Sequence, residues 1–251
     1  MNKRFVIAVL LIGSLFAVGA ALAQDHPPVH WTYEGEEGPD HWGELSPDYT
    51  KCVDGSAQSP INVTDAQAVD LVDIAFNYGS TQLNILNNGH TIQVTADPGS
   101  SITYNEVQFN LAQFHFHNPS EHEIDSAAAP MEIHFVHAND AGDLAVVGVM
   151  LVEGAENEAF AGVFSNLPAE EGETPMAITV DLGALLPADR HFFTYGGSLT
   201  TPPCSENVRW LLLDVPVELS HEQIEAFAAI FEGNARPVQE RHDRDLFYDA
   251  S

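Results

Sequence analysis

Lysine and arginine are scarce in this 251-residue chain, which has 8 basic residues against 37 acidic ones and a formal net charge of -29. A surface of that sign repels phosphate backbones, so the composition excludes nucleic acid as a partner. The same excess of carboxylates keeps a protein soluble, and it also suits a salty environment that screens the repulsion between like charges. We expect an acidic surface and salt tolerance, with plain solubility as the alternative interpretation.

Cysteine is almost absent, because Cys52 and Cys204 are the 2 in the chain. Zinc sites built on cysteine usually carry two of them only about two to four residues apart, and no such pair occurs here. In an oxidising compartment, two cysteines far apart in the sequence favour a disulfide. Such a bridge would close a long loop, for which chain entropy predicts at most about 4 to 5 kcal/mol of stabilisation.

Long hydrophobic runs are missing beyond the N-terminus, so no later segment is expected to span a bilayer. The early run at 5–18 follows two basic residues and precedes the sequence Ala-Leu-Ala at 21–23. This order is typical of a cleavable signal peptide, with an uncleaved anchor as the alternative. We therefore expect a signal peptide over 1–23 and a mature domain over 24–251 that is periplasmic or secreted and has no membrane contact after cleavage.

Short runs rich in Val, Ile, Phe and Thr recur between turn residues, which is the pattern of a sheet-dominated domain. The run at 144–151 is apolar almost throughout, so its strand should be buried on both faces. No repeat, linker or low-complexity segment interrupts the chain, so one domain is expected. The predicted strands include 82–86, 91–95, 108–117, 131–137, 144–151 and 209–215.

Helical patterns are few in this sequence. Ser220 and Gln223 form a capping box ahead of apolar positions at helical spacing, and Gly233 should close that helix. A shorter helix is expected near 156–164. Residues 25–54 are rich in Gly, Pro, Asp and aromatic residues without periodicity, which indicates an ordered arm lying over the core.

Histidines alternate with aromatic residues in two of the predicted strands. In a strand, Gln113, His115 and His117 share one face, and the phenylalanines between them take the other. Glu132 and His134 repeat this alternation, so pairing of the two strands would bring a third imidazole to the first two. Three neutral imidazoles leave one position of a zinc ion open, as a catalytic site requires. Gln113 and Glu132 lie on the right face to hold the second nitrogens of the ligand rings.

Two other interpretations of these histidines are open from the residues alone. Alternating histidines also occur as polar side chains on a solvated strand. In addition, His115, His117 and Glu121 have the H-x-H-x3-E spacing of a cupin metal site. A cupin places its last histidine on a distant second motif, whereas His134 follows Glu121 too closely for the usual intervening strands.

Several stretches of the sequence, taken in order, resemble the motifs of the alpha-carbonic anhydrases over about 31–236. The resemblance implies a fold around a central, largely antiparallel twisted sheet. It also implies zinc-dependent, reversible hydration of CO2 to bicarbonate and a proton, by attack of a zinc-bound hydroxide. Carbonic anhydrase is itself the reference case for a three-histidine zinc site whose bound water has a pKa of about 7. The stretches are Gln58 to Asn62, Asn87 to His90, Gln113 to His117, Ser120 to His122, Glu132 to His137 and Gly197 to Pro203.

The resemblance assigns zinc to His115, His117 and His134, and it implies a role for two threonines. The Thr200 hydroxyl would accept a hydrogen bond from the hydroxide and donate one to Glu121. Thr201 and the Thr200 backbone would contact bicarbonate. This chain of hydrogen bonds would orient the nucleophile. The apolar wall for CO2 would consist of Val136, Val146, Leu199 and Trp210.

Proton export is assigned by the same resemblance to His90, at the position of the family's proton shuttle. A histidine that titrates near neutrality suits that task. The water network leading to it would be lined by Tyr33, Asn88 and Gln93, with Gln93 in place of a common Asn.

Other residues of these motifs are expected to be structural. His122 is expected to be a buried hydrogen-bonding residue, and His137 lies on the opposite strand face from His134. Cys52 and Cys204 match the bridge of secreted family members. Ser59-Pro60 and Pro202-Pro203 are candidates for cis peptide bonds.

Two classes of function compete with the enzyme. A non-catalytic relative could keep the fold as a binding module, but such a relative usually loses a zinc histidine, and all three are present here. A periplasmic zinc buffer would need no Thr200, Glu121 and His90 around an open coordination position. The sequence leaves the oligomeric state undecided, with a homodimer among the alternatives.

Overall fold

Strands dominate residues 29–249, the part of the chain that the structure, a computed structural model, describes. The helices are α1 (Trp42–Leu45), α2 (Lys51–Asp54), α3 (Glu158–Phe164) and α4 (His221–Ala228), with 3-10 turns at Gly35–Glu37, Pro47–Tyr49 and Leu182–Leu185. The strands are β1 (Asn62–Val63), β2 (Gln67–Ala68), β3 (Ala75–Asn77), β4 (Ser80–Asn87), β5 (Ile92–Thr95), β6 (Ser101–Tyr104), β7 (Val107–His117), β8 (Glu123–Ile124), β9 (Ala127–Ala128), β10 (Met131–Ala138), β11 (Leu144–Glu153), β12 (Gly172–Asp181), β13 (Phe192–Ser198), β14 (Glu206–Leu219) and β15 (Phe247–Asp249).

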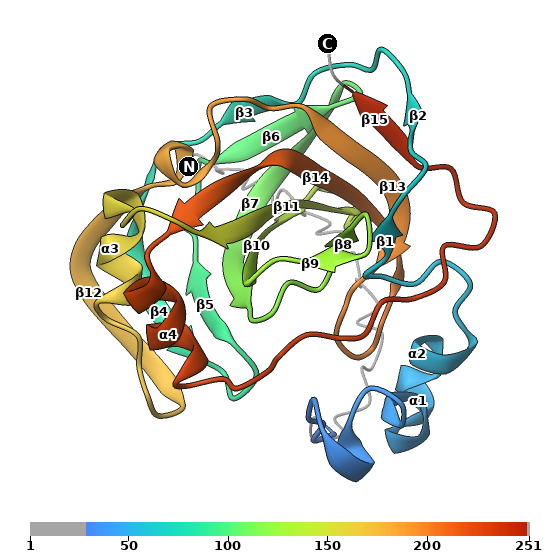
Figure 1. Cartoon of the computed structure of the whole chain (residues 1–251), viewed down its shortest axis with the longest axis horizontal. Helices are drawn as coiled ribbons and strands as arrows, with labels where there is room; N and C mark the ends of the chain where they lie inside the picture. Colours follow the sequence, from blue (N-terminus) through green and yellow to red (C-terminus); the bar gives the residue numbers. More distant parts are fainter. Residues whose placement is uncertain (1–28, 250–251) are drawn as a thin grey trace, which may run out of the picture.

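A 12-stranded twisted sheet crosses the molecule in the order β12-β4-β5-β7-β10-β11-β14-β13-β15-β2 (Figure 1). β6 also pairs with β7, and β3 pairs with β6. Most neighbours are antiparallel, but β11 and β14 run parallel in the middle of the sheet and β15 and β2 run parallel at one end. A separate small sheet consists of β1, β8 and β9. The predicted mainly β fold around a largely antiparallel sheet is therefore confirmed, and all the named strands are present.

The two faces of the sheet have different neighbours. On β7 and β10, Phe114, Phe116 and Phe135 are fully buried in the larger hydrophobic core. The intervening histidines lie on the opposite face, beside a second hydrophobic cluster that includes Val146 and Trp210. Residues 145–151 of β11 are all buried, so this strand is covered on both faces as predicted.

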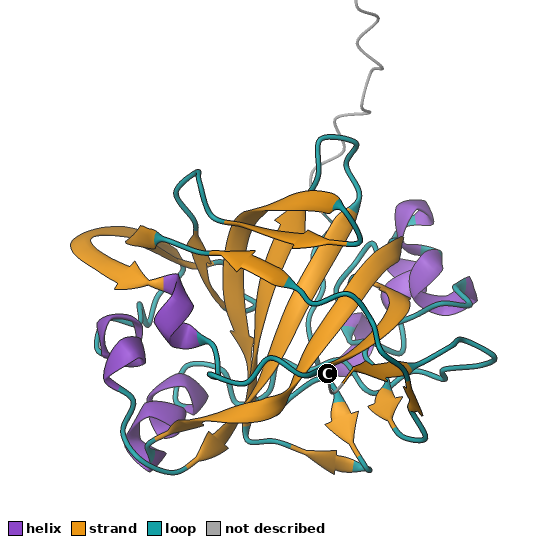
Figure 2. Ribbon diagram, turned by 90° about the horizontal axis from the view of Figure 1, so that it is seen from above, coloured by secondary structure: helices purple, strands orange, loops and turns teal. Residues whose placement is uncertain are grey.

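The helices lie at the two flanks of the sheet (Figure 2). α3 contacts β12 and β4, and it occurs where a short helix was expected. α4 begins with the predicted capping box of Ser220 and Gln223, but it ends at Ala228 and does not reach Gly233. The reason is a tight turn in which the carbonyl of Phe227 accepts hydrogen bonds from the backbone N–H groups of both Ile230 and Phe231.

The predicted N-terminal arm is ordered over its described part, where it forms α1, α2 and two 3-10 turns. Trp42 anchors it, because its side chain is fully buried and its Nε1 donates to the carbonyl of Thr32 at 2.9 Å. The predicted signal peptide over 1–23 lies outside the described residues. Within 29–249, no helix combines the length and apolarity needed to cross a membrane.

Candidate metal centre

Three histidines converge from two adjacent strands. β7 and β10 pair in antiparallel orientation. In this pairing His134 lies opposite His115, and Glu132 lies opposite His117. Each of the three rings offers one ligand atom, and these atoms all lie within 4.8 Å of one another. The alternation along the two strands therefore brings His115, His117 and His134 together as the sequence predicts.

Carboxamide and carboxylate side chains hold the second nitrogens of two of these rings. Nδ1 of His115 lies 2.9 Å from Oε1 of Gln113, two residues earlier on the same strand face. Nε2 of His134 lies 2.8 Å from Oε1 of Glu132, a close contact that lacks good hydrogen-bond geometry. Such contacts fix ring orientation and tautomer in metal sites. Gln113 and Glu132 are thus in the positions that the sequence assigned to them.

His117 has a different second partner, which sequence reasoning missed. Its Nδ1 donates to the backbone carbonyl of Asn234 at 2.7 Å, more than 100 residues later in the chain. Its Nε2 is buried and has no hydrogen-bond partner among the described residues. Burial of a ring nitrogen whose lone pair receives no hydrogen bond costs free energy, unless a cation binds that lone pair. No motif marks Asn234 in the sequence.

The charge state of the rings also suits a metal ion. Burial lowers the pKa of His117 to about 4, and burial together with the neighbouring His117 and His134 holds the pKa of His115 well below its ordinary value. Both rings are therefore neutral at physiological pH, as metal ligands must be. Three imidazoles whose ligand atoms lie within 4.8 Å of one another, two of them held neutral by burial, fit a zinc ion.

A second group of close ligand atoms consists of His122, Glu132 and His134. His122 has no free ring nitrogen, because Nδ1 lies 2.9 Å from Glu132 Oε1 and Nε2 lies 2.7 Å from the Tyr195 hydroxyl. Burial alone would raise the pKa of Glu132, but His122 and His134 hold it well below its usual range. This group is a hydrogen-bonded support for His134, and His122 is the buried hydrogen-bonding residue that was expected.

His137 points away from the site, as its strand parity predicts. Its ring is buried on the other face, where Nδ1 donates to the carbonyl of Ala145 at 3.2 Å and Nε2 lies 2.8 Å from the Tyr78 hydroxyl. It therefore cannot join the other three histidines.

Glu121 lies beside the histidines with one carboxylate oxygen committed. Its Oε1 accepts the backbone N–H of Arg236 at 2.9 Å, whereas Oε2 has no hydrogen-bond partner among the described residues and lies 3.5 Å from His117 Nε2. Burial raises the pKa of Glu121 to about 7, while interactions with His134, the Arg236 backbone amide and the Thr200 side chain act in the opposite direction. Thr200 is thus close enough to Glu121 to interact with it.

A cavity of about 120 Å³ adjoins the histidines and contains the residues predicted for proton export. Two of the metal-ligand candidates, His115 and His117, form part of its wall. The rest of the lining includes Tyr33, Asn88, His90, Gln93 and Thr201.

His90 stacks on Trp31 at the rim of this cavity. Their ring centroids are 3.6 Å apart and their planes differ by 6°. Burial and the nearby His30 lower the pKa of His90, and the carboxylate of Glu171 raises it. The side chain of Asn234 donates to the backbone carbonyl of His90 at 3.0 Å, so one residue supports both His90 and His117. Sequence reasoning identified His90 but none of these neighbours.

An apolar wall stands next to His134. Val136, Val146 and Trp210 are opposite one another on β10, β11 and β14, and the rings of His134 and Trp210 are 4.9 Å apart. Leu199 packs against the same cluster. The four residues predicted to receive CO2 are therefore gathered in one place.

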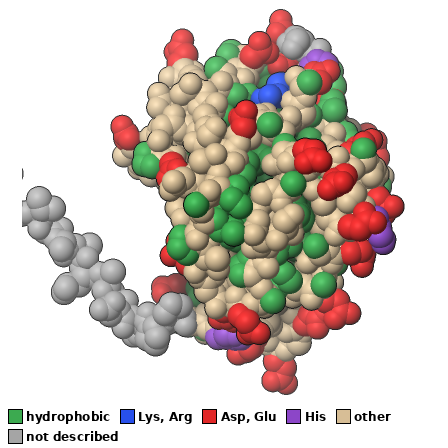
Figure 3. All heavy atoms as spheres, turned by 90° about the vertical axis from the view of Figure 1, so that its left-hand side faces the viewer, with side chains coloured by type: hydrophobic (Ala, Val, Ile, Leu, Met, Phe, Trp, Pro, Cys, Tyr) green, Lys and Arg blue, Asp and Glu red, His purple; other side chains and the backbone are tan. Residues whose placement is uncertain are grey.

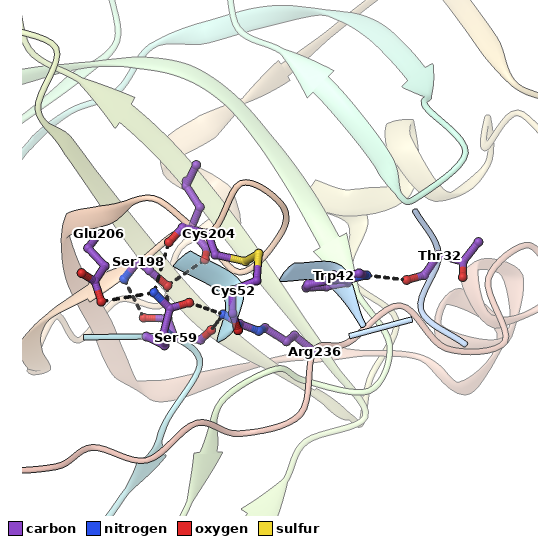
Figure 4. The surroundings of a disulfide bond; sticks show 10 residues. Thr32, Trp42, Cys52, Ser59, Ser198, Cys204, Glu206 and Arg236 are labelled. Atoms are coloured by element: carbon purple, nitrogen blue, oxygen red, sulfur yellow. Dashed lines mark hydrogen bonds between the residues drawn. A yellow bond between two sulfur atoms is a disulfide. The ribbon is translucent and has the colours of Figure 1, made fainter. Parts of the chain in front are cut away.

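The predicted disulfide joins Cys52 to Cys204 across 152 residues (Figure 4). Arg236 reaches the same region, where Nη2 donates to the carbonyl of Cys52 at 3.0 Å and Nη1 donates to the carbonyl of Ser59 at 2.8 Å. Ser59 in turn donates its backbone N–H to Ser198 Oγ at 2.9 Å. The segment that carries Thr200 is thus tied at Ser198 to Ser59 and at Cys204 to Cys52 of the N-terminal arm. The bonds Ser59-Pro60 and Pro202-Pro203 are cis as suggested, and so is Asn118-Pro119, which was not foreseen.

Comparison with known proteins agrees with this geometry. The family model described as eukaryotic-type carbonic anhydrase matches residues 37–250. A carbonic anhydrase of Pectobacterium carotovorum is 46% identical over 228 residues, which cover 88% of this chain and 91% of the relative. A carbonic anhydrase of Nostoc sp. is 42% identical over 249 residues, which cover 95% of this chain and 93% of the relative. The structure of alpha-carbonic anhydrase from Thermovibrio ammonificans with sulfanilamide matches with a TM-score of 0.86 and 41% identity, over 88% of this chain and 100% of that one.

Proposed function

Because this chain belongs to the eukaryotic-type, or alpha, carbonic anhydrase family and is an enzyme of that kind, we propose that it hydrates CO2 reversibly at a zinc ion held by His115, His117 and His134. The observation that supports this most is the convergence of three ring nitrogens within 4.8 Å of one another. The products are bicarbonate and a proton.

The protein's part in holding the metal is to keep the three rings oriented. Gln113, Glu132 and the Asn234 carbonyl occupy the second nitrogens, so the first nitrogens remain directed at the ion. Zinc would supply a coordinated water with a pKa of about 7, the value for which carbonic anhydrase is the reference case, and so a strong nucleophile at neutral pH.

Thr200 and Glu121 would orient the attacking oxygen. Because the backbone N–H of Arg236 already donates to Oε1 of Glu121, Oε2 is left to accept a hydrogen bond from the Thr200 hydroxyl. The Thr200 oxygen then has to act as an acceptor toward the nucleophile, because its only proton is committed. This arrangement directs a lone pair of the nucleophile at CO2, which is catalysis by orientation.

CO2 would bind against the apolar wall of Val136, Val146, Leu199 and Trp210, where an uncharged linear molecule loses little by leaving water. Thr201 and the Thr200 backbone N–H would contact bicarbonate. The proton would cross the cavity through waters held by Tyr33, Asn88 and Gln93 to the ring of His90, which passes it to buffer.

The deciding experiment combines zinc analysis with stopped-flow CO2 hydration on the mature chain. We expect one zinc per chain and rapid hydration, with both lost in His115→Ala and both retained in His242→Ala, a histidine outside the site. One zinc per chain without hydration would leave a binding module or a zinc buffer as the function, and absence of zinc would reject the proposal.

We also propose that residues 1–23 direct export and that the catalytic domain over 24–251 works in the periplasm or outside the cell. The disulfide supports this, because such bonds persist in oxidising compartments. The mature protein isolated from the periplasm or the medium should begin at Gln24. An N-terminus at Met1 in the active enzyme would contradict it.

A further inference from the structure

Arginines without carboxylate partners gather on one surface of this strongly acidic protein. Within 29–249, every ion pair between a Lys or Arg and a carboxylate involves Lys51. None of the five described arginines makes one, although the chain has 37 acidic residues, and three of the five, Arg209, Arg241 and Arg244, belong to this surface. Unpaired guanidinium groups are notable where carboxylates are so abundant.

Strand pairing places two of these arginines side by side. Gly196 on β13 is the direct partner of Arg209 on β14, and Arg244 donates from Nη1 to the carbonyl of Gly196 at 3.0 Å. Val208 and Trp210 are buried while Arg209 is exposed, so the Arg209 side chain points outward, away from the apolar wall of the metal centre.

A hollow of about 360 Å³ lies between them. Gly196 forms part of it, and a Cβ added at Gly196 would meet no atom within 4 Å, so the missing side chain leaves open space. The hollow is lined by Gly196, Gly197, Asn207, Arg209, Arg244 and Asp245, among others.

The Arg244 guanidinium is held in place before any ligand arrives. Its Nε donates to the carbonyl of Arg241 at 2.8 Å and Nη2 donates to the carbonyl of Glu240 at 2.8 Å, in addition to the bond to Gly196. A guanidinium has five N–H donors, so two remain for a ligand. Its charge also lies over the ring of Tyr195, with 5.5 Å between Cζ and the ring centroid.

We propose that this hollow binds a small dianionic oxyanion of the sulfate or phosphate class between the guanidinium groups of Arg209 and Arg244. Guanidinium groups match the oxygen spacing of such anions and bind them through charge-assisted hydrogen bonds. The volume suits a small ligand. Asp245 lines the hollow and Glu206 lies near Arg244, and both carboxylates repel anions, so the ligand is expected on the glycine side of the hollow.

The test is an NMR titration of the mature, zinc-loaded protein with sulfate and then phosphate, at constant ionic strength maintained with chloride. We expect saturable shifts of the backbone amides of Gly196, Gly197 and Asn207. Arg209→Ala should weaken binding at least tenfold, whereas Arg190→Ala, a variant of an arginine elsewhere on the surface, should leave the affinity unchanged.

A second variant tests whether binding needs the open volume of the hollow as well as the charges of the two arginines. Gly196→Val keeps both arginines but fills the hollow, and it should also abolish saturable binding. If this variant does not fold, Arg209→Ala still decides the question. Equal, unsaturated shifts with chloride and sulfate, or undiminished affinity in Arg209→Ala, would overturn the inference. None of these measurements depends on CO2 hydration, so this site and the proposed function can fail independently.

Discussion

Asn234 shows how much of the site depends on single residues that have no motif. Its carbonyl accepts from His117, and its side chain donates to the carbonyls of His90 and Phe116 at 3.0 Å each. The residue is fully buried, and each of these contacts satisfies a group that would otherwise be costly to bury. Asn234 therefore holds both His117, a metal-ligand candidate, and His90, the proton-shuttle candidate.

Removal of the shuttle ring should affect only the proton-transfer part of the cycle. We predict that His90→Ala lowers kcat in weak buffer by roughly a hundredfold, the lower end of the roughly 10²- to 10⁴-fold that a general acid or base typically contributes. The ratio kcat/KM for CO2 should stay unchanged, because His90→Ala leaves the apolar wall and Thr200 intact. Imidazole added to the buffer should restore kcat. An unchanged rate in weak buffer would remove His90 from the mechanism.

The charge of Glu171 should adjust the basicity of His90. Because this carboxylate raises the pKa of His90 while burial and His30 lower it, Glu171→Gln should lower that pKa. Glu34 and Glu232 line the same rim and remain in the variant. The measurement is an NMR titration of the His90 ring, with Glu173→Gln, two residues later in the chain and on β12, as the matched control. Equal pKa values in wild type and Glu171→Gln would contradict the role of Glu171.

At the scale of elements, β11 approaches β10 closely beside the metal-ligand candidate His134. Gly148 on β11 is opposite His134, and a Cβ at this position would lie 2.6 Å from Leu212 Cδ2 and 3.0 Å from Glu132 Oε1. The absence of a side chain thus lets Glu132 reach His134. Both neighbours are buried and lack room to move.

We therefore predict that Gly148→Ala destabilises the fold by about 1 to 3 kcal/mol through overpacking. It should also weaken zinc affinity, because Glu132 must shift away from His134. Urea unfolding and a competition assay with a zinc chelator measure the two effects. Gly233→Ala is the control, since a Cβ there meets no atom within 4 Å. If Gly148→Ala binds zinc as tightly as the wild-type protein does, the contact between Glu132 and His134 does not contribute to zinc affinity.

Elements whose signal is local were predictable from the sequence, and those set by distant contacts were not. The alternation of His115 and His117 with phenylalanines has the period of a strand, so it predicted both β7 and the convergence with His134. β12 was missed because most of its residues are exposed and Pro175 lies where its pairing with β4 shifts register. Gly233 suggested a helix end, but the turn at Phe227 closed α4 earlier. Trp31, Glu171 and Asn234 reach His90 from segments far apart in the chain, which no local pattern reveals.

At the scale of the whole molecule, net charge opposes folding. The formal charge is -29, and on the face in Figure 3 Asp and Glu side chains far outnumber Lys and Arg. Like charges on a compact surface repel one another, and salt shortens the range of this repulsion.

Stability should therefore rise with sodium chloride. We predict that the Tm increases between about 10 mM and 1 M, as the Debye length falls from roughly 30 Å to 3 Å. Thermal unfolding followed by circular dichroism measures it, with an uncharged osmolyte as the control for general exclusion effects. Chloride is the appropriate anion, because sulfate also strengthens apolar burial. A Tm that falls with added chloride would show that attractive ion pairs outweigh the repulsion.

Zinc X-ray absorption spectroscopy on the purified protein tests the three-histidine metal centre most directly. We predict a four-coordinate ion with three imidazole nitrogens at about 2.0 to 2.1 Å and one oxygen ligand. His134→Ala should remove one imidazole from that shell or lose the metal. A spectrum with sulfur ligands, or with fewer than three imidazoles in the wild-type protein, would contradict a shared ion at His115, His117 and His134.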